Sequence, residues 1–103
     1  MSLIGQSVTV IGAGVAGLAV ARALALRGAS LTVLEQSDAI REVGAGLQIS
    51  PNGAAVLRAL GLQEALDQAS VRAEAVELID GPTGDAVARL DLARLRPGQG
   101  YHF

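Results

Sequence analysis

The chain has 103 residues, of which 50% are hydrophobic and 2% aromatic, and its formal net charge is −2. This length suits one small domain or a piece of a larger one, and the mild acidity gives no indication of a nucleic-acid partner. The sequence has no cysteine and one histidine, which excludes disulfide and thiolate chemistry and argues against a zinc site.

The first element in chain order is a short apolar strand that runs directly into glycines. Residues 7–11 have the pattern of a buried strand, and Gly12, Gly14 and Gly17 follow with the spacing G-x-G-x-x-G. In such a turn the first glycine permits the bend, the second lets the backbone approach a pyrophosphate, and the third lets the helix lie close to the strand. The N–H groups and dipole at the start of the helix would attract the anion.

The predicted helix covers residues 15–27, is apolar on almost every side, and is stopped by Gly28. Residues 30–35 predict a second, parallel strand that ends in Glu35. A carboxylate about 20 residues beyond the glycine loop suits a ribose diol, whose two hydroxyls donate to it, and its charge disfavours a 2′-phosphate. Two alternatives stay open: a glycine-rich turn in another kind of βαβ unit, and a solvated strand-end acid at Glu35.

The apolar stretch around the first helix predicts a buried element rather than a membrane span. Glycines and Arg22 interrupt it, and no basic leader or secretory signal is visible. We therefore expect a cytoplasmic protein with no membrane partner.

Beyond Glu35 the periodic pattern is lost until a pair of short helices. Gln36 opens a turn, residues 39–43 are short helical or irregular, and residues 44–46 form a second glycine-rich bend before a brief extended piece at 47–49. Ser50 is the expected N-cap of a helix that begins at Pro51 and runs to Gly61. A second short helix covers residues 63–69.

In the last third of the chain, side-chain character alternates with a period of two residues. Two alternating segments flank the turn cluster at residues 81–84, which predicts a β-hairpin with a loop of about four residues. Residues 93–100 read as a loop, and residues 101–103 as the start of another strand. His102 is therefore expected to be an ordinary strand residue.

The segment Arg41-Glu42-Val43-Gly44-Ala45-Gly46-Leu47-Gln48-Ile49-Ser50-Pro51-Asn52 makes the sequence recognisable. Together with the glycine loop and Glu35, it resembles the FAD-dependent aromatic-ring monooxygenases of the salicylate and para-hydroxybenzoate hydroxylase type. The resemblance runs through essentially the whole chain. Many nucleotide-binding proteins share the glycine loop, whereas the segment at 41–52 is much more specific.

The resemblance implies an α/β fold in two parts. Residues 1–72 would be the Rossmann-like βαβ start of a doubly wound parallel sheet that binds FAD, and residues 73–103 would be a hairpin and the start of a second, substrate-binding sheet. Family members are several times longer than this chain. We therefore expect a fragment that is not catalytic alone and exposes apolar surface, covered by the remainder of its own chain or by another subunit.

The resemblance also implies roles for particular residues. The glycine loop would hold the FAD pyrophosphate, Glu35 the adenosine ribose, and Arg41 the region of the pyrophosphate and ribityl chain, unless Arg41 is a surface arginine. The segment that begins at Gly44 would pass close to the flavin. The whole cofactor-binding set is Gly12, Ala13, Gly14, Val15, Ala16, Gly17, Glu35, Gln36, Arg41, Gly44, Ala45, Gly46, Leu47 and Gln48. No catalytic residue or metal ligand is assigned.

The implied reaction uses NADH or NADPH as a transient electron donor. The donor would reduce the flavin, which would react with oxygen to form a flavin hydroperoxide that hydroxylates a small aromatic substrate. The cofactor carries that chemistry while the protein positions and shields it. Alternatives are another two-domain FAD oxidoreductase, of the ubiquinone-ring hydroxylase or flavin reductase type, or a non-catalytic dinucleotide-binding module.

Overall fold

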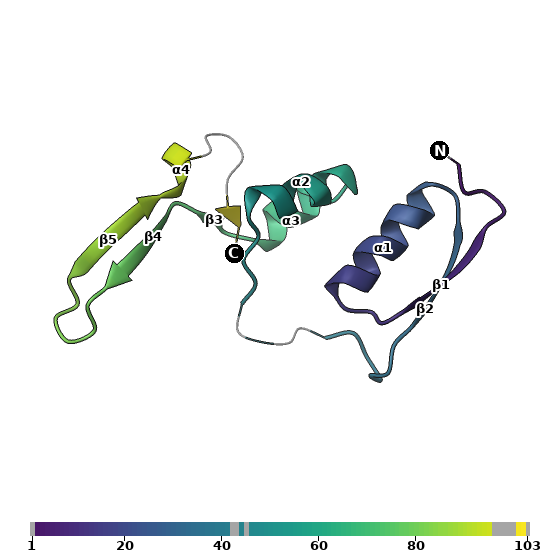
Figure 1. Ribbon diagram of the computed structural model, residues 1–103, viewed down its shortest axis with the longest axis horizontal. Helices are drawn as coiled ribbons and strands as arrows, with labels where there is room; N and C mark the ends of the chain where they lie inside the picture. The colour runs from purple at the N-terminus through teal and green to yellow at the C-terminus, as the bar shows by residue number, and fades with distance from the viewer. Residues whose placement is uncertain (1, 42–43, 45, 96–100, 103) are drawn as a thin grey trace. The chain divides into compact units, whose positions relative to one another are not determined.

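The computed structural model describes residues 2–41, 44, 46–95 and 101–102 (Figure 1). The chain forms two compact units, Met1–Val43 and Gly44–Phe103. Each unit is described by itself below.

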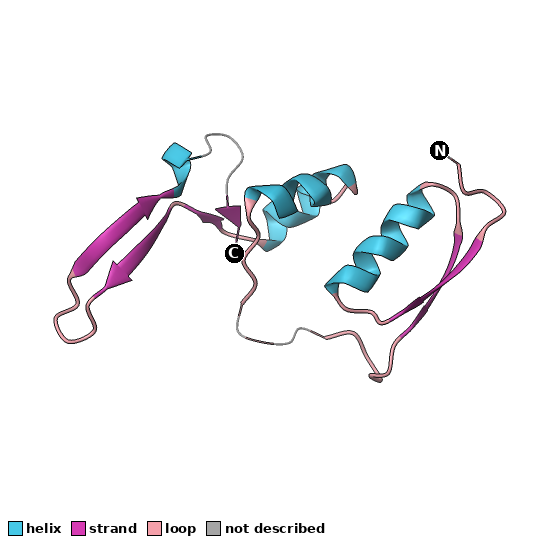
Figure 2. Cartoon of the chain, viewed as in Figure 1, coloured by secondary structure: helices cyan, strands magenta, loops and turns pink. Residues whose placement is uncertain are grey.

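The first unit is a β–α–β arrangement. β1 (Ser7–Ile11) and β2 (Ser30–Leu34) pair in parallel from Ser7 opposite Ser30 to Ile11 opposite Leu34. The connecting helix α1 (Val15–Leu26) packs against both strands, as Figure 2 shows. The sequence predicted all three elements. The helix ends one residue earlier than expected, and the Arg27 guanidinium donates to the Ala23 carbonyl at 2.9 Å, which opposes the negative end of the helix dipole.

The interior of the first unit is small. Among its described residues, the buried hydrophobic side chains are Ala13 and Ala21. Large apolar side chains stay in solvent, including Ile11 with 86% of its surface exposed and Val15 with 74%. Because alanine has little surface to bury, this unit gains little hydrophobic stabilisation from its own contacts.

The second unit contains shorter elements. They are α2 (Pro51–Ala59), α3 (Gln63–Ala69), β3 (Arg72–Ala73), β4 (Ala75–Ile79), β5 (Ala86–Asp91), α4 (Leu92–Leu95) and β6 (Tyr101–His102). Ser50 occupies the predicted N-cap of α2 and Pro51 its first position. The Ser50 hydroxyl bonds to the side-chain oxygen of Asn52 and makes no capping bond to the helix backbone.

The predicted hairpin is formed by β4 and β5, which pair antiparallel from Ala75 opposite Asp91 to Ile79 opposite Ala86. Asp80 and Asp85 close the turn, because the Asp80 N–H donates to the Asp85 carbonyl at 2.8 Å. The loop between Asp80 and Asp85 has four residues, which is the predicted length. On one face, Arg89 and Glu77 form an ion pair across the strands at 2.6 Å.

One local prediction in the second unit needs correction, and one is confirmed with a pairing that the sequence did not indicate. Residues 93–95, expected in a loop, belong to α4, whose start is favoured by the Asp91 carboxylate accepting the Arg94 N–H at 3.4 Å. The strand at 101–102 is present as β6, but it pairs antiparallel with β3, a partner the sequence did not indicate. Residues 96–100 and Phe103 lie outside the described part of the chain.

The segment before α2 is described only in part. Residues 39–41 are neither helix nor strand, while residues 42, 43 and 45 lie outside the described set. Within the residues that the structure describes, no helix combines the length and the apolar character that crossing a membrane requires.

Candidate functional site

The turn between β1 and α1 contains two glycines that no other residue could replace without strain or a steric clash. Gly12 has a φ of +104°, a backbone conformation that residues other than glycine rarely adopt. A Cβ on Gly17 would lie 1.9 Å from the Gly12 carbonyl oxygen, so only glycine lets α1 sit this close to the turn. These observations match the predicted roles of the first and third glycines.

Gly14 differs from Gly12 and Gly17, because nothing within the described chain requires a glycine at position 14. Its φ is −75°, which any residue can adopt, and a Cβ would meet no atom within 4 Å. Gly14 is also the N-cap of α1, where no side chain caps the helix and no acidic residue lies in the first turn. The space beside Gly14 is therefore open toward a helix N-terminus suited to an anion.

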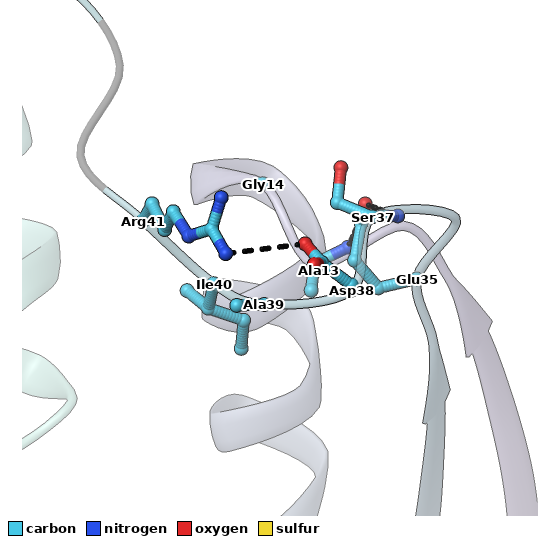
Figure 3. A pocket seen from close by; sticks show the side chains of 8 residues that line it. All are labelled: Ala13, Gly14, Glu35, Ser37, Asp38, Ala39, Ile40 and Arg41. Carbon is cyan, nitrogen blue, oxygen red and sulfur yellow. Dashed lines mark hydrogen bonds and ion pairs between the residues drawn. The ribbon is translucent and has the colours of Figure 1, made fainter.

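Glu35 lies directly after β2 and is fixed by two backbone donors (Figure 3). The Ala13 N–H donates to one carboxylate oxygen at 3.0 Å, and the Ser37 N–H donates to the other at 2.8 Å. The bond from Ala13, followed by those from Ser37, holds the pKa of Glu35 below its ordinary value. Since each carboxylate oxygen can accept more than one hydrogen bond, both oxygens retain capacity for a ligand hydroxyl.

A pocket with a volume of about 360 Å³ lies between the glycine turn and the chain that follows β2. Its lining residues are Ala13, Gly14, Glu35, Ser37, Asp38, Ala39, Ile40 and Arg41. At its rim, the Arg41 guanidinium lies 3.4 Å from the Asp38 carboxylate, as the dashed line in Figure 3 marks. Both side chains are well exposed, at 69% and 83%.

The groups around this pocket fit the adenosine diphosphate part of FAD. The uncapped start of α1 supplies backbone donors for a diphosphate. The missing Cβ at Gly14 leaves room for the diphosphate, and the carboxylate of Glu35 can accept two ribose hydroxyls. The guanidinium of Arg41 can pair with phosphate oxygens.

The structure brings part of the predicted set together. Ala13, Gly14, Glu35 and Arg41 line this pocket, and Gly12 and Gly17 shape the turn beside it. The other predicted residues of the first unit do not line it: Val15 and Ala16 begin α1, and Gln36 lies exposed in the bend after Glu35. Gly44, Gly46, Leu47 and Gln48 are exposed residues of the second unit, and Ala45 is outside the described residues.

Four lining residues were not singled out from the sequence: Ser37, Asp38, Ala39 and Ile40. Two of them carried a signal. Ser37 stands two residues after the strand-end acid, where its N–H can return to the carboxylate, and Asp38 stands three residues before Arg41 with the opposite charge. Ala39 and Ile40 carried no signal, because only the path of the backbone places them at the pocket.

Comparison with known proteins agrees with this geometry. Residues 6–101 match the family model described as the FAD binding domain. The chain is 46% identical over 85 residues to 3-amino-4-hydroxybenzoate 2-monooxygenase of Streptomyces cremeus, covering 82% of this chain and 22% of that protein. It is 37% identical over 88 residues to 3-hydroxybenzoate 6-hydroxylase 1 of Aquipseudomonas alcaligenes, covering 85% and 22%. The chain thus spans about a fifth of the length of these curated relatives.

Solved structures show the same similarity. The crystal structure of the p-nitrophenol 4-monooxygenase PnpA from Pseudomonas putida DLL-E4 superposes with a TM-score of 0.81 and 25% identity, covering 99% of this chain and 26% of that one. The structure of Klebsiella pneumoniae HpxO complexed with FAD and uric acid gives a TM-score of 0.73 and 29% identity, covering 87% and 22%. The α/β architecture, with its parallel βαβ start and separate antiparallel hairpin, is therefore shared with FAD-dependent monooxygenases.

Proposed function

Because this chain belongs to the FAD-binding domain family, we propose that the pocket beside its glycine turn binds the adenosine diphosphate part of FAD. One observation carries the proposal. The space beside Gly14 would accept a Cβ without contact, yet it faces an uncapped helix N-terminus, and Glu35 is fixed by hydrogen bonds at the same pocket. That combination supplies backbone donors for a diphosphate and an acceptor for a ribose.

The proposal assigns a role to each part of the predicted set. The diphosphate lies along residues 12–17 with the N–H groups of the turn directed at its oxygens. The ribose hydroxyls donate to Glu35, next to Gln36, and Arg41 pairs with a phosphate oxygen. Residues 44–48 approach the flavin, where glycines at 44 and 46 permit close contact. The described residues support the first two roles most directly, through the open space at Gly14 and the bonds to Glu35.

For the protein that carries this domain we propose an aromatic-ring monooxygenase. The relatives named above are monooxygenases, some of them of hydroxybenzoates, and the chain's share in such an enzyme is to bind and orient the cofactor. When bound, FAD would transfer electrons from NADH or NADPH and activate oxygen toward a small aromatic substrate. We place the protein in the cytoplasm and divide this chain into a FAD-binding part at 1–72 and a substrate-sheet part at 73–103.

The test uses the protein expressed from its complete reading frame. Flavin absorbance after purification or reconstitution reports binding, and oxygen consumption with NADH or NADPH is followed across a panel of phenols and hydroxybenzoates. We expect bound FAD and NAD(P)H oxidation that an aromatic compound stimulates. Bound FAD without aromatic stimulation would favour another FAD oxidoreductase, and a protein that neither binds FAD nor oxidises NAD(P)H would overturn the proposal.

A further inference from the structure

Two successive N–H groups of the glycine turn are held by two successive residues at the end of β2. The Gly12 N–H donates to the Leu34 carbonyl at 2.6 Å, which is a backbone bond directly after β1. The next N–H, that of Ala13, donates to a carboxylate oxygen of Glu35 at 3.0 Å. Beyond Gly12, therefore, it is a side chain and not the backbone of β2 that fastens the turn to the neighbouring strand.

The bond from Ala13 is better shielded from water than the second bond to the Glu35 carboxylate, which comes from Ser37. Ala13 is buried, with 8% of its surface exposed, whereas Ser37 lies in an exposed bend. Water can therefore replace the carboxylate as the acceptor for the Ser37 N–H, but it reaches the Ala13 N–H poorly. Since a shielded N–H without an acceptor is unfavourable, loss of the carboxylate favours a turn in which Ala13 has moved.

A shift of Ala13 would move the groups that the diphosphate needs. Ala13 directly precedes Gly14, the N-cap of α1, and the free N–H groups of the first helical turn follow at once. Donors that are already in place bind a ligand more tightly, because no binding free energy is lost in ordering them. The acceptor that holds Ala13 therefore bears on the diphosphate, although it makes no contact with it.

We propose that Glu35 is a positioning residue for the diphosphate: by accepting the Ala13 N–H, it fixes the glycine turn in the shape that binds this group. The proposal rests on the proposed function, because it takes the pocket to be the FAD site. It goes beyond that function, which assigns Glu35 to the ribose hydroxyls alone. A carboxylate that acted only through the ribose and through its charge would weaken diphosphate binding, since like charges repel.

The experiment separates the two roles of Glu35 with a ligand that lacks the ribose hydroxyls. FAD and an FAD analogue made with 2′,3′-dideoxyadenosine carry the same diphosphate and the same flavin. Their dissociation constants are measured by flavin fluorescence on the flavin-stripped protein, expressed from its complete reading frame. Hydrogen exchange of the peptide that spans the glycine turn, measured by mass spectrometry without ligand, reports the Ala13 N–H independently.

The matched variants are Glu35→Gln and Glu35→Met, which are both uncharged and of similar length. Only glutamine has a side-chain oxygen that can accept the Ala13 N–H, and water can serve the exposed Ser37 N–H in its place. Glu35→Ala is a second variant without an acceptor. Glu64→Gln and Glu64→Met repeat the comparison at an exposed acid of α3 in the second unit. Circular dichroism confirms that each variant is folded.

We expect Glu35→Met to bind the dideoxy analogue about two- to tenfold more weakly than Glu35→Gln, which is the net effect of one hydrogen bond. Glu35→Ala should resemble Glu35→Met, and in both the turn peptide should exchange faster than in Glu35→Gln. The two Glu64 variants should bind the analogue equally.

Equal affinity of folded Glu35→Gln and Glu35→Met for the analogue, with equal exchange of the turn peptide, would overturn this inference alone. Glu35 would then act through the ribose and its charge, and the proposed FAD site would stand. A wild-type protein that binds neither FAD nor the analogue would overturn the proposed function itself.

Discussion

A substitution at Gly14 should affect ligand binding more than folding, because a side chain at this position would lie in open space. We expect Gly14→Val to fold with a free energy of unfolding within about 1 kcal/mol of the wild type, the usual range for an N-cap change. FAD affinity should fall by about ten- to a hundredfold, because a branched side chain would overlap the diphosphate. Thermal melting of the flavin-free protein and a flavin titration measure the two effects. A Gly14→Val protein that still binds FAD tightly would mean that the turn has been assigned wrongly.

Glu35 gives the pocket a pH dependence whose sign can be worked out. Hydrogen bonds from the N–H groups of Ala13 and Ser37 lower its pKa in the folded state below the ordinary value of 4.5. A lowered folded-state pKa means that the carboxylate contributes stability above the unfolded value, and that this contribution is lost as pH falls through the folded value. Glu35→Gln also turns an amide N–H toward one of the two backbone donors, since glutamine has a single side-chain acceptor oxygen.

We therefore expect wild type to be more stable than Glu35→Gln at pH 6–7, with the difference shrinking as pH falls below about 4.5. Melting curves of both proteins across pH 3–7 measure this, with Glu64→Gln as a control that removes an equal charge from α3 of the second unit. FAD affinity of Glu35→Gln should fall as well, because one ribose acceptor is lost. A stability difference independent of pH would show that the two N–H bonds do not depend on the charge of Glu35.

The residues that could be predicted from the sequence are those whose role depends on local spacing. The glycine turn and Glu35 belong to this group, because a strand, a turn and a helix of standard length bring them together. Asp38 does not. Its pairing with Arg41 depends on the path of an irregular segment, for which neither the helical nor the strand period gives a side-chain direction.

Gly17 sets the distance between α1 and the glycine turn. A Cβ at this position would lie 1.9 Å from the Gly12 carbonyl oxygen, an atom of the backbone that cannot move alone. Gly17→Ala should therefore displace α1 and cost about 1–3 kcal/mol of folding free energy, the range for overpacked sites. Urea unfolding measures the loss, and Gly14→Ala is the matched control, since a Cβ at Gly14 meets nothing. Equal stability of the two variants would contradict the close packing described here.

Helices and strands could be predicted where a local sequence pattern specifies them, and not where they depend on contacts between distant residues. β1, α1 and β2 carry strong local patterns and lie within a residue of their predicted bounds. The hairpin carries both an alternating pattern and a turn cluster. α4 directly follows Asp91 and is only four residues long, which is too short to show a helical period. The β3–β6 pair joins two-residue strands that are far apart in sequence, so no local signal could reveal their pairing.

The distribution of apolar surface bears on the behaviour of the whole chain. Among the described residues, the first unit buries alanines at 13 and 21 while Ile11, Val15 and Leu34 stay largely in solvent. The hairpin is similar, with Leu78 and Leu90 exposed. Large apolar side chains that gather on an exposed face mark surfaces that pack against other polypeptide. We propose that further parts of the same protein or another subunit cover these faces.

Residues 1–103 expressed alone should therefore self-associate and bind FAD weakly. Concentration-dependent sedimentation and a flavin titration measure both properties. If the exposed face of α1 drives association, Val20→Glu and Leu26→Glu should reduce it, because both side chains are more than half exposed and can carry a charge without being buried. The glycine turn and Glu35 both lie within the first unit. Weak FAD binding by these variants would therefore mean that the contacts within this unit alone do not hold the pocket in shape. A monodisperse, cooperatively melting 1–103 that binds FAD tightly would contradict this expectation, because two buried alanines would then suffice to order the site.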